Sequence, residues 1–139
     1  MQRAIGVLIY MGCIGIGSFT NAALISLGYT LIPPPEGFNM AHPVEFQNAI
    51  AHMHAKHFIF PFLAHGFGTF CSAWLWCSIK RKATWKATLG IAAVFFSGGL
   101  YMAFILDAPI IFEALDLCYA YFPMGLVGYS LRLKTTQCV

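Results

Sequence analysis

Charged residues are scarce in this chain. Its 139 residues include 8 Lys and Arg and 5 Asp and Glu, so 9% of the residues are charged while 59% are hydrophobic. Soluble globular domains usually carry about a quarter of their residues as charged side chains. The composition therefore excludes an ordinary soluble domain and indicates a chain that lies in a membrane.

The chain also lacks the common short motifs of catalysis. It contains no Cys-x-x-Cys pair, no glycine-rich phosphate loop, no Gly-x-Ser-x-Gly turn and no haem attachment motif. Cys13, Cys71, Cys77 and Cys118 lie inside long apolar stretches, and Cys138 lies in the C-terminal tail. These absences argue against a disulfide scaffold, an iron–sulfur site and nucleotide-driven chemistry. They favour a non-enzymatic role.

Four long apolar stretches are present, over residues 4–32, 58–79, 85–106 and 109–131. Each is long enough, at about 1.5 Å of helix rise per residue, to cross a hydrocarbon core about 30 Å thick. The first stretch is longer than the apolar core of a signal peptide, so we expect it to be retained as a span. The sequence predicts one all-α domain over residues 1–139, a four-helix transmembrane bundle.

The basic residues predict the orientation of the bundle, because Lys and Arg beside spans accumulate on the cytoplasmic side. In a four-span arrangement all but one of them fall on the side that holds both termini. They are Arg3, Lys80, Arg81, Lys82, Lys86, Arg132 and Lys134. We therefore expect a multi-pass protein of the bacterial inner membrane with cytoplasmic N and C termini. The net charge of +3 then reflects topology and gives no reason to expect a nucleic-acid partner.

The long connection between the first two stretches carries the next signals. Pro33-Pro34-Pro35 cannot continue a helix, and Pro43 suits the first turn of a new one. Apolar residues between Val44 and Met53 recur at three- and four-residue spacing. This spacing predicts a short amphipathic helix in the first outer loop.

Histidines cluster where that helix ends. His52, His54 and His57 are residues of the type that binds divalent metals, and Glu113 could complete a ligand set at an outer-face enzyme site. Their spacing matches no zinc signature. The alternative is a wet interfacial segment in which histidines contact water and lipid headgroups, and this alternative is favoured over a divalent-metal cofactor.

A sharper set of polar residues lies inside the predicted spans. His65 and Asp116 each lie seven residues beyond the outer end of their span, a depth of about 10 Å. Equal depth predicts that the two side chains can meet. Glu113 lies one turn above Asp116, and Asn21 and Thr69 can reach the same layer. Such a cluster could relay protons, hold a cation or bind a polar headgroup, or it could be a buried polar clasp that fixes helix register.

Small residues and a proline predict the packing around this layer. Ala64, Gly68 and Ser72 recur every four residues, a pattern that allows close approach of helices in membranes. Pro123 is expected to kink the fourth span below Asp116 and to open space beside the acid.

The chain resembles a family of small four-span bacterial integral membrane proteins of uncharacterised activity. The residues that carry the resemblance are Pro33-Pro34-Pro35-x-Gly37, Ala64-His65-x-x-Gly68-Thr69-Phe70, Gly98-Gly99 and Leu115-Asp116-Leu117-x-x-Ala120-Tyr121-x-Pro123-Met124. The resemblance implies the four-span architecture and no activity. A histidine metal site would be peculiar to this chain.

Three functions fit the sequence. The sequence favours the first, an accessory or structural subunit of a membrane assembly, with the lipid bilayer and either a second copy or a larger complex as partners. The second is a small transport module that handles protons or cations through an intramembrane pair of His65 and Asp116. The third is the outer-face metal enzyme described above.

Overall fold

Helices make up the whole regular structure of the computed structural model, which describes residues 2–38, 41–80 and 83–137. The elements in chain order are α1 (Gln2–Leu31), α2 (Pro43–Ala51), the 3-10 turn η1 (Ala55–Phe58), α3 (Ile59–Ile79), α4 (Trp85–Ile105), α5 (Ile110–Leu115), the π-helical turn η2 (Asp116–Ala120) and α6 (Phe122–Gln137). These described ranges contain no strand. The all-α prediction is therefore confirmed.

Within the described residues, four helical segments are long and apolar enough to cross a membrane. They are Ala4–Leu31, Ala55–Ile79, Trp85–Ile105 and Ile110–Arg132, close to the four predicted spans. Of the predicted basic positions, Arg81 and Lys82 lie outside the described residues, as does Cys138. The side chains of Arg3 and Lys134 also lie outside them.

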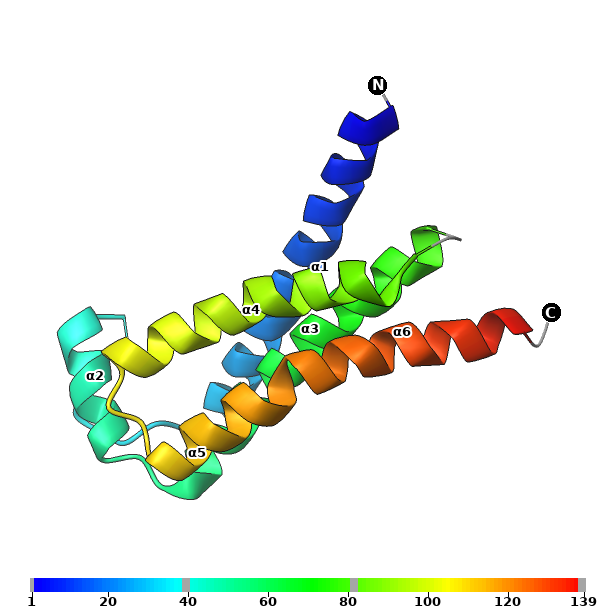
Figure 1. Ribbon diagram of the computed structural model, residues 1–139. Coiled ribbons are helices and arrows are strands. Elements are labelled where there is room, and N and C mark those ends of the chain that lie inside the picture. Colours follow the sequence, from blue (N-terminus) through cyan, green and yellow to red (C-terminus); the bar gives the residue numbers. More distant parts are fainter. Residues whose placement is uncertain (1, 39–40, 81–82, 138–139) are drawn as a thin grey trace.

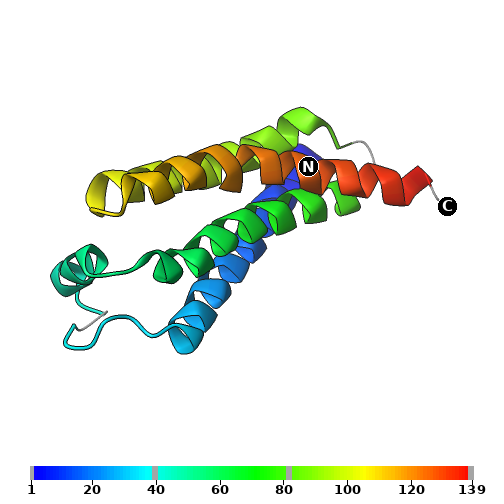
Figure 2. The same cartoon turned by 90° about the horizontal axis from the view of Figure 1, so that it is seen from below.

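The segments run up and down between two ends of the molecule (Figure 1). Both termini and the connection between α3 and α4 lie at one end, which we name the terminal end. Helix α2 and the connection between α4 and α5 lie at the other, the loop end. Helix α3 is central, because α1, α4 and α6 all pack against it. Figure 2 shows α1 crossing α3 at an angle, with α4 and α6 on the opposite side of α3.

Small residues allow α1 and α3 to approach closely. A Cβ atom at Gly17 would overlap the Ser72 hydroxyl and the Gly68 carbonyl. A Cβ at Gly68 would lie 2.8 Å from the Gly17 carbonyl oxygen. The Ser72 hydroxyl donates a hydrogen bond of 2.9 Å to the carbonyl of Cys13. The predicted small-residue stripe thus packs against α1, where close backbone contact takes the place of large side chains.

Large apolar side chains cover the outside of the bundle. Phe104 is 83% exposed, Phe19 75% and Leu8 72%. A soluble monomer rarely exposes this much contiguous apolar surface. Hydrocarbon chains solvate such side chains as well as other apolar side chains do, so this surface suits a protein that spans a bilayer.

Helix α2 forms where its sequence pattern predicts it, with Pro43 in the first turn. It buries Ala49 and Ile50 against the loop end of the bundle. The Gln47 side-chain amide donates a hydrogen bond of 2.8 Å to the carbonyl of Ile105. This bond ties α2 to the end of α4.

The fourth span is interrupted in the middle. Its α-helical start ends at Leu115, the π-turn η2 follows, and α6 begins at Phe122. Pro123 occupies the first turn of α6, where its missing N–H is tolerated. Because Pro123 cannot donate to the carbonyl four residues earlier, the α-helical ladder cannot run unbroken through this region. The predicted proline effect is therefore accompanied by a π-turn that begins at Asp116 itself.

Candidate functional site

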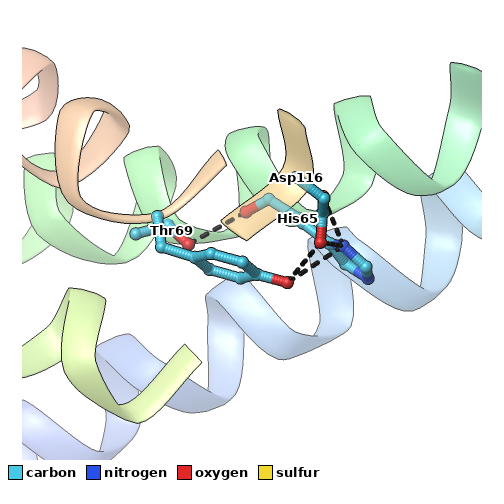
Figure 3. Close-up of polar contacts among 4 residues, drawn as sticks. His65, Thr69 and Asp116 are labelled. Carbon is cyan, nitrogen blue, oxygen red and sulfur yellow. Dashed lines mark hydrogen bonds and ion pairs between the residues drawn. The ribbon is translucent and has the colours of Figure 1, made fainter. Parts of the chain in front are cut away.

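The structure places His65 and Asp116 in direct contact, as their equal depth predicts. The His65 Nδ1 atom lies 2.9 Å from Oδ1 and 2.8 Å from Oδ2 of Asp116 (Figure 3). The side chain of Asp116 is 6% exposed and that of His65 is 22% exposed. A carboxylate at this depth is stabilised by such a partner, because low dielectric surroundings strengthen the bond and penalise an unpaired charge.

Tyr121 completes this group, which we name the triad. Its hydroxyl donates to Asp116 Oδ2 at 2.8 Å and lies 3.1 Å from His65 Nδ1. The ring of Tyr121 stacks on the ring of His65, with centroids 5.7 Å apart. Tyr121 is 1% exposed, so its hydroxyl depends on Asp116 and His65 for hydrogen-bond partners.

Sequence reasoning did not assign Tyr121 to the site. Residues five apart on a regular α-helix are separated by about 140° around the axis, which would put Asp116 and Tyr121 on different faces. A π-turn has i to i+5 hydrogen bonding and rotates less per residue. The turn over Asp116–Ala120 therefore brings the two side chains together. The one available signal was a tyrosine in the same turn region as the predicted proline break.

Gly99 leaves the space that the Tyr121 hydroxyl occupies. A Cβ atom at Gly99 would overlap this hydroxyl and the ring carbon that bears it. The edge of Phe96 packs on the same ring, with centroids 5.8 Å apart and planes at 86°. Helix α4 thereby holds Tyr121 in place from the side opposite α3.

The remaining predicted members of the polar layer lie near the triad in different ways. The Thr69 hydroxyl donates to the backbone carbonyl of His65 at 2.9 Å (Figure 3). Its hydrogen bond therefore stays within α3 and does not reach the carboxylate of Asp116. Asn21 lines a groove beside His65. Glu113 lines a cavity together with Asp116. Within the described part of the chain, no hydrogen bond or ion pair to the Glu113 carboxylate forms.

The cavity that Glu113 lines lies at the loop end and has a volume of about 140 Å³. We name it the outer cavity. Residues of α2 and η1 border it on one side, and α3, α4 and the fourth span enclose the rest. His65, Asp116 and Gly99 lie in its wall. The triad is therefore accessible from this cavity.

A groove between α1 and α4 also borders the triad. It has a volume of about 470 Å³ and is lined by Asn21 and Ser18 of α1, by residues of α4 and by Tyr121. His65 and Gly99 line this groove as well as the outer cavity. Asp116 thus borders the cavity, Tyr121 borders the groove, and His65 borders both.

The hydrogen-bond pattern defines what the triad can do with a proton. An ionised carboxylate only accepts hydrogen bonds, so we assign the Nδ1 proton of His65 and the hydroxyl proton of Tyr121 as donors to Asp116. None of the described residues bonds to His65 Nε2. A proton can therefore be added at Nε2, giving an imidazolium paired with Asp116, while every existing bond of the triad remains.

The outer-loop histidines do not form a ligand set. His52 Nδ1 bonds to the carbonyl of Asn48 at 2.9 Å. His57 Nδ1 accepts from the backbone N–H of His54 at 3.0 Å, and its Nε2 lies 3.2 Å from the Pro33 carbonyl, to which it donates. The described ranges contain no group of three His, Cys, Asp or Glu side chains that could hold a metal ion. Backbone groups bond to both ring nitrogens of His57, which leaves that ring no nitrogen for a metal.

No protein-family model matches the chain, and comparisons with curated proteins and with solved structures also find no match. The resemblance to small four-span bacterial membrane proteins stays a prediction. Any functional assignment rests on the geometry of the triad, the outer cavity and the groove.

Proposed function

We propose that this chain is a small membrane transport module that binds and passes protons at the triad of His65, Asp116 and Tyr121. The observation that carries this proposal is that the triad borders both the outer cavity and the groove, with His65 in the wall of each. Ionisable residues inside a membrane are costly, and they commonly mark proton or ion pathways. A structural clasp requires no cavity on either side.

The chemistry of the triad supports the proposal. His65 takes up a proton at Nε2, and Asp116 stabilises the resulting cation through Nδ1. The Tyr121 hydroxyl, at 2.8 Å from Asp116 and 3.1 Å from His65 Nδ1, holds the carboxylate in place when the imidazole releases that proton. The ring lies in the wall of both spaces, so His65 can exchange its proton with either one.

Proton flux in liposomes tests this function. Purified protein is reconstituted with a pH-sensitive dye inside the vesicles, the membrane potential is clamped, and the outside is acidified. We expect internal acidification above that of empty vesicles, and we expect Asp116→Asn to reduce it to the background. Asp107→Asn is the matched control, since Asp107 is exposed and does not line either space. Flux in Asp116→Asn equal to that of the unmodified protein would contradict the proposal.

The topology that accompanies this function has cytoplasmic termini in a bacterial inner membrane. Lys80 and Lys86 lie beside the connection at the terminal end of the bundle, where the basic-residue rule places the cytoplasm. The outer cavity then opens toward the opposite side. Protease protection of tags on the two termini in inverted vesicles checks this assignment.

An accessory role in a larger assembly is a second candidate, and the terminal half of α1 favours it. A Cβ atom at Gly12 or at Gly15 would have no neighbour within 4 Å, and Leu8 and Met11 are more than half exposed. This half of α1 diverges from the rest of the bundle (Figure 1). Intact mass spectrometry of particles extracted in native nanodiscs tests this candidate, because a subunit would retain a partner chain there.

A further inference from the structure

The outer cavity has the size and the lining of a binding site for a small organic molecule. Its volume of about 140 Å³ is close to that of an engineered apolar cavity of about 150 Å³ that binds benzene. Apolar side chains form most of the wall, including Ile25, Ile50 and Met102. A ligand for this space therefore has an apolar body of about one six-membered ring.

The polar groups in the wall select the charge of that ligand. Glu113 and Asp116 both line the cavity, and its lining within the described residues contains no Lys or Arg. Asp116 is occupied by two donors of the triad, whereas the described residues give Glu113 no partner. Glu113 is half-buried, and the part of a carboxylate that lies against apolar side chains is poorly solvated without a partner. A ligand that donates hydrogen bonds and carries positive charge supplies that partner.

Aromatic rings add to the preference for a cation. Phe46, Phe58 and Phe112 line the cavity, and the rings of Phe58 and Phe112 lie 4.8 Å apart. The face of an aromatic ring attracts an ammonium group, and the attraction is stronger where the group is desolvated. An anion would be repelled by the carboxylates of Glu113 and Asp116.

We propose that the outer cavity binds a small hydrophobic ammonium ion, with the ammonium group at Glu113 and the apolar body between α2 and the fourth span. The binding site itself follows from the cavity, while the coupling of this ligand to protons rests on the proposed function of the triad. Positive charge at Glu113, one turn from Asp116, disfavours a second positive charge on His65. The cation and the proton therefore compete, which makes exchange of one for the other the expected reaction.

Helix α2 forms part of the wall of this site at the loop end, and we name it the cover. Phe46 and Ile50 of α2 and Met53 just after it line the cavity. The hydrogen bond from the exposed side chain of Gln47 to the Ile105 carbonyl holds this cover to the end of α4. The ligand enters from the loop end when the cover lifts.

Binding of 2-phenylethylammonium to the protein in nanodiscs tests the inference. The matched neutral probe is 2-phenylethanol, which has the same ring and linker without the charge, and empty nanodiscs measure partitioning into lipid. Binding is followed by isothermal titration and by saturation-transfer NMR. We expect the ammonium to bind at least about tenfold more tightly than the alcohol, as for hydrogen bonds to charged groups. Equal affinities of the two probes overturn the inference.

Variants locate the charge that selects the ligand. Glu113→Gln should weaken binding of the ammonium by at least about tenfold and leave the alcohol unchanged, whereas Asp107→Asn should bind both probes as the unmodified protein does. Unchanged ammonium binding in a folded Glu113→Gln variant also overturns the inference. If this variant does not fold, the preference of the unmodified protein for the ammonium over the alcohol decides the question.

The binding result and the flux result are independent. Ammonium binding that depends on Glu113, together with absent proton flux, supports this site and contradicts the proposed proton function. Proton flux that depends on Asp116, together with equal binding of the two probes, supports the function and overturns this site.

Discussion

The two sides of α3 differ in how they hold their neighbours. Toward α1, the helix presents Gly68 and Ser72, and backbones approach so closely that a methyl group at Gly17 has no room. Toward the fourth span, it presents His65, which meets Asp116 and Tyr121 across a π-turn and borders two open spaces. The first side gives a regular, tightly packed support. The second side depends on an irregular helix and leaves room for a ligand.

The difference indicates a division of roles along one helix. Close packing on the α1 side fixes the position of α3 in the bundle, since small residues allow extensive van der Waals contact in membranes. The π-turn on the other side costs regular hydrogen bonding but brings Asp116 and Tyr121 to one point. Substitutions that address each side separately can test this division.

The largest effect is expected on the packed side. Gly17→Leu places a large side chain where the Ser72 hydroxyl and the Gly68 carbonyl lie, and overpacking of this kind costs about 3 kcal/mol. Gly12→Leu is the matched control in the same helix, since a Cβ atom at Gly12 would have no neighbour within 4 Å. Thermal unfolding in detergent should separate the two variants strongly. Equal stability of both would show that the α1–α3 contact is not tight.

The next effect concerns the centre of the triad. Asp116→Asn removes the charge that accepts from His65 and Tyr121 and brings an amide donor toward the His65 donor. We expect a loss of about 2 kcal/mol in the free energy of unfolding, within the range for hydrogen bonds to buried charged groups. Reversible unfolding measured for this variant and for Asp107→Asn checks the value, and similar losses in both would argue against a buried ion pair.

A smaller, coupled effect is expected at Gly99. Gly99→Ala places a methyl group on the Tyr121 hydroxyl and should cost about 1–2 kcal/mol, as for moderate overpacking. Tyr121→Phe removes that hydroxyl, so adding Gly99→Ala to it should cost less than adding it to the unmodified protein. A double-mutant cycle measures this coupling. If the effects of the two substitutions on stability are additive, the methyl group at position 99 and the Tyr121 hydroxyl are not in contact.

The smallest effect is expected at the cover of the outer cavity. Gln47→Ala removes the exposed bond to the Ile105 carbonyl, and such a bond contributes about 0.5–1 kcal/mol. Global stability should therefore change little. Hydrogen exchange in α2 should be faster in the variant than in the unmodified protein, while exchange in α3 should stay the same. Unchanged exchange in α2 would show that other contacts hold the cover.

Regular features of this molecule could be predicted from its sequence, and irregular ones could not. The spans, α2 and the contact of His65 with Asp116 follow from constant helix rise and from apolar patterning. Tyr121 was not predicted as a partner of Asp116, because the π-turn that joins them depends on packing against α3 and α4. For the loop histidines the sequence favoured an interfacial segment over a metal site, and residue type alone does not reveal that backbone groups bond to Nδ1 of His52 and to both ring nitrogens of His57.

The most direct test of the triad as a working proton site is an acid-minus-base infrared difference spectrum of the protein in nanodiscs. We predict imidazole bands and shifted carboxylate bands that disappear together in Asp116→Asn and in His65→Gln and persist in Asp107→Asn. Such bands mean that the Asp116 carboxylate responds when its partner His65 takes up a proton. A spectrum that is the same in all four proteins would contradict this account and would leave the triad as a static clasp between helices.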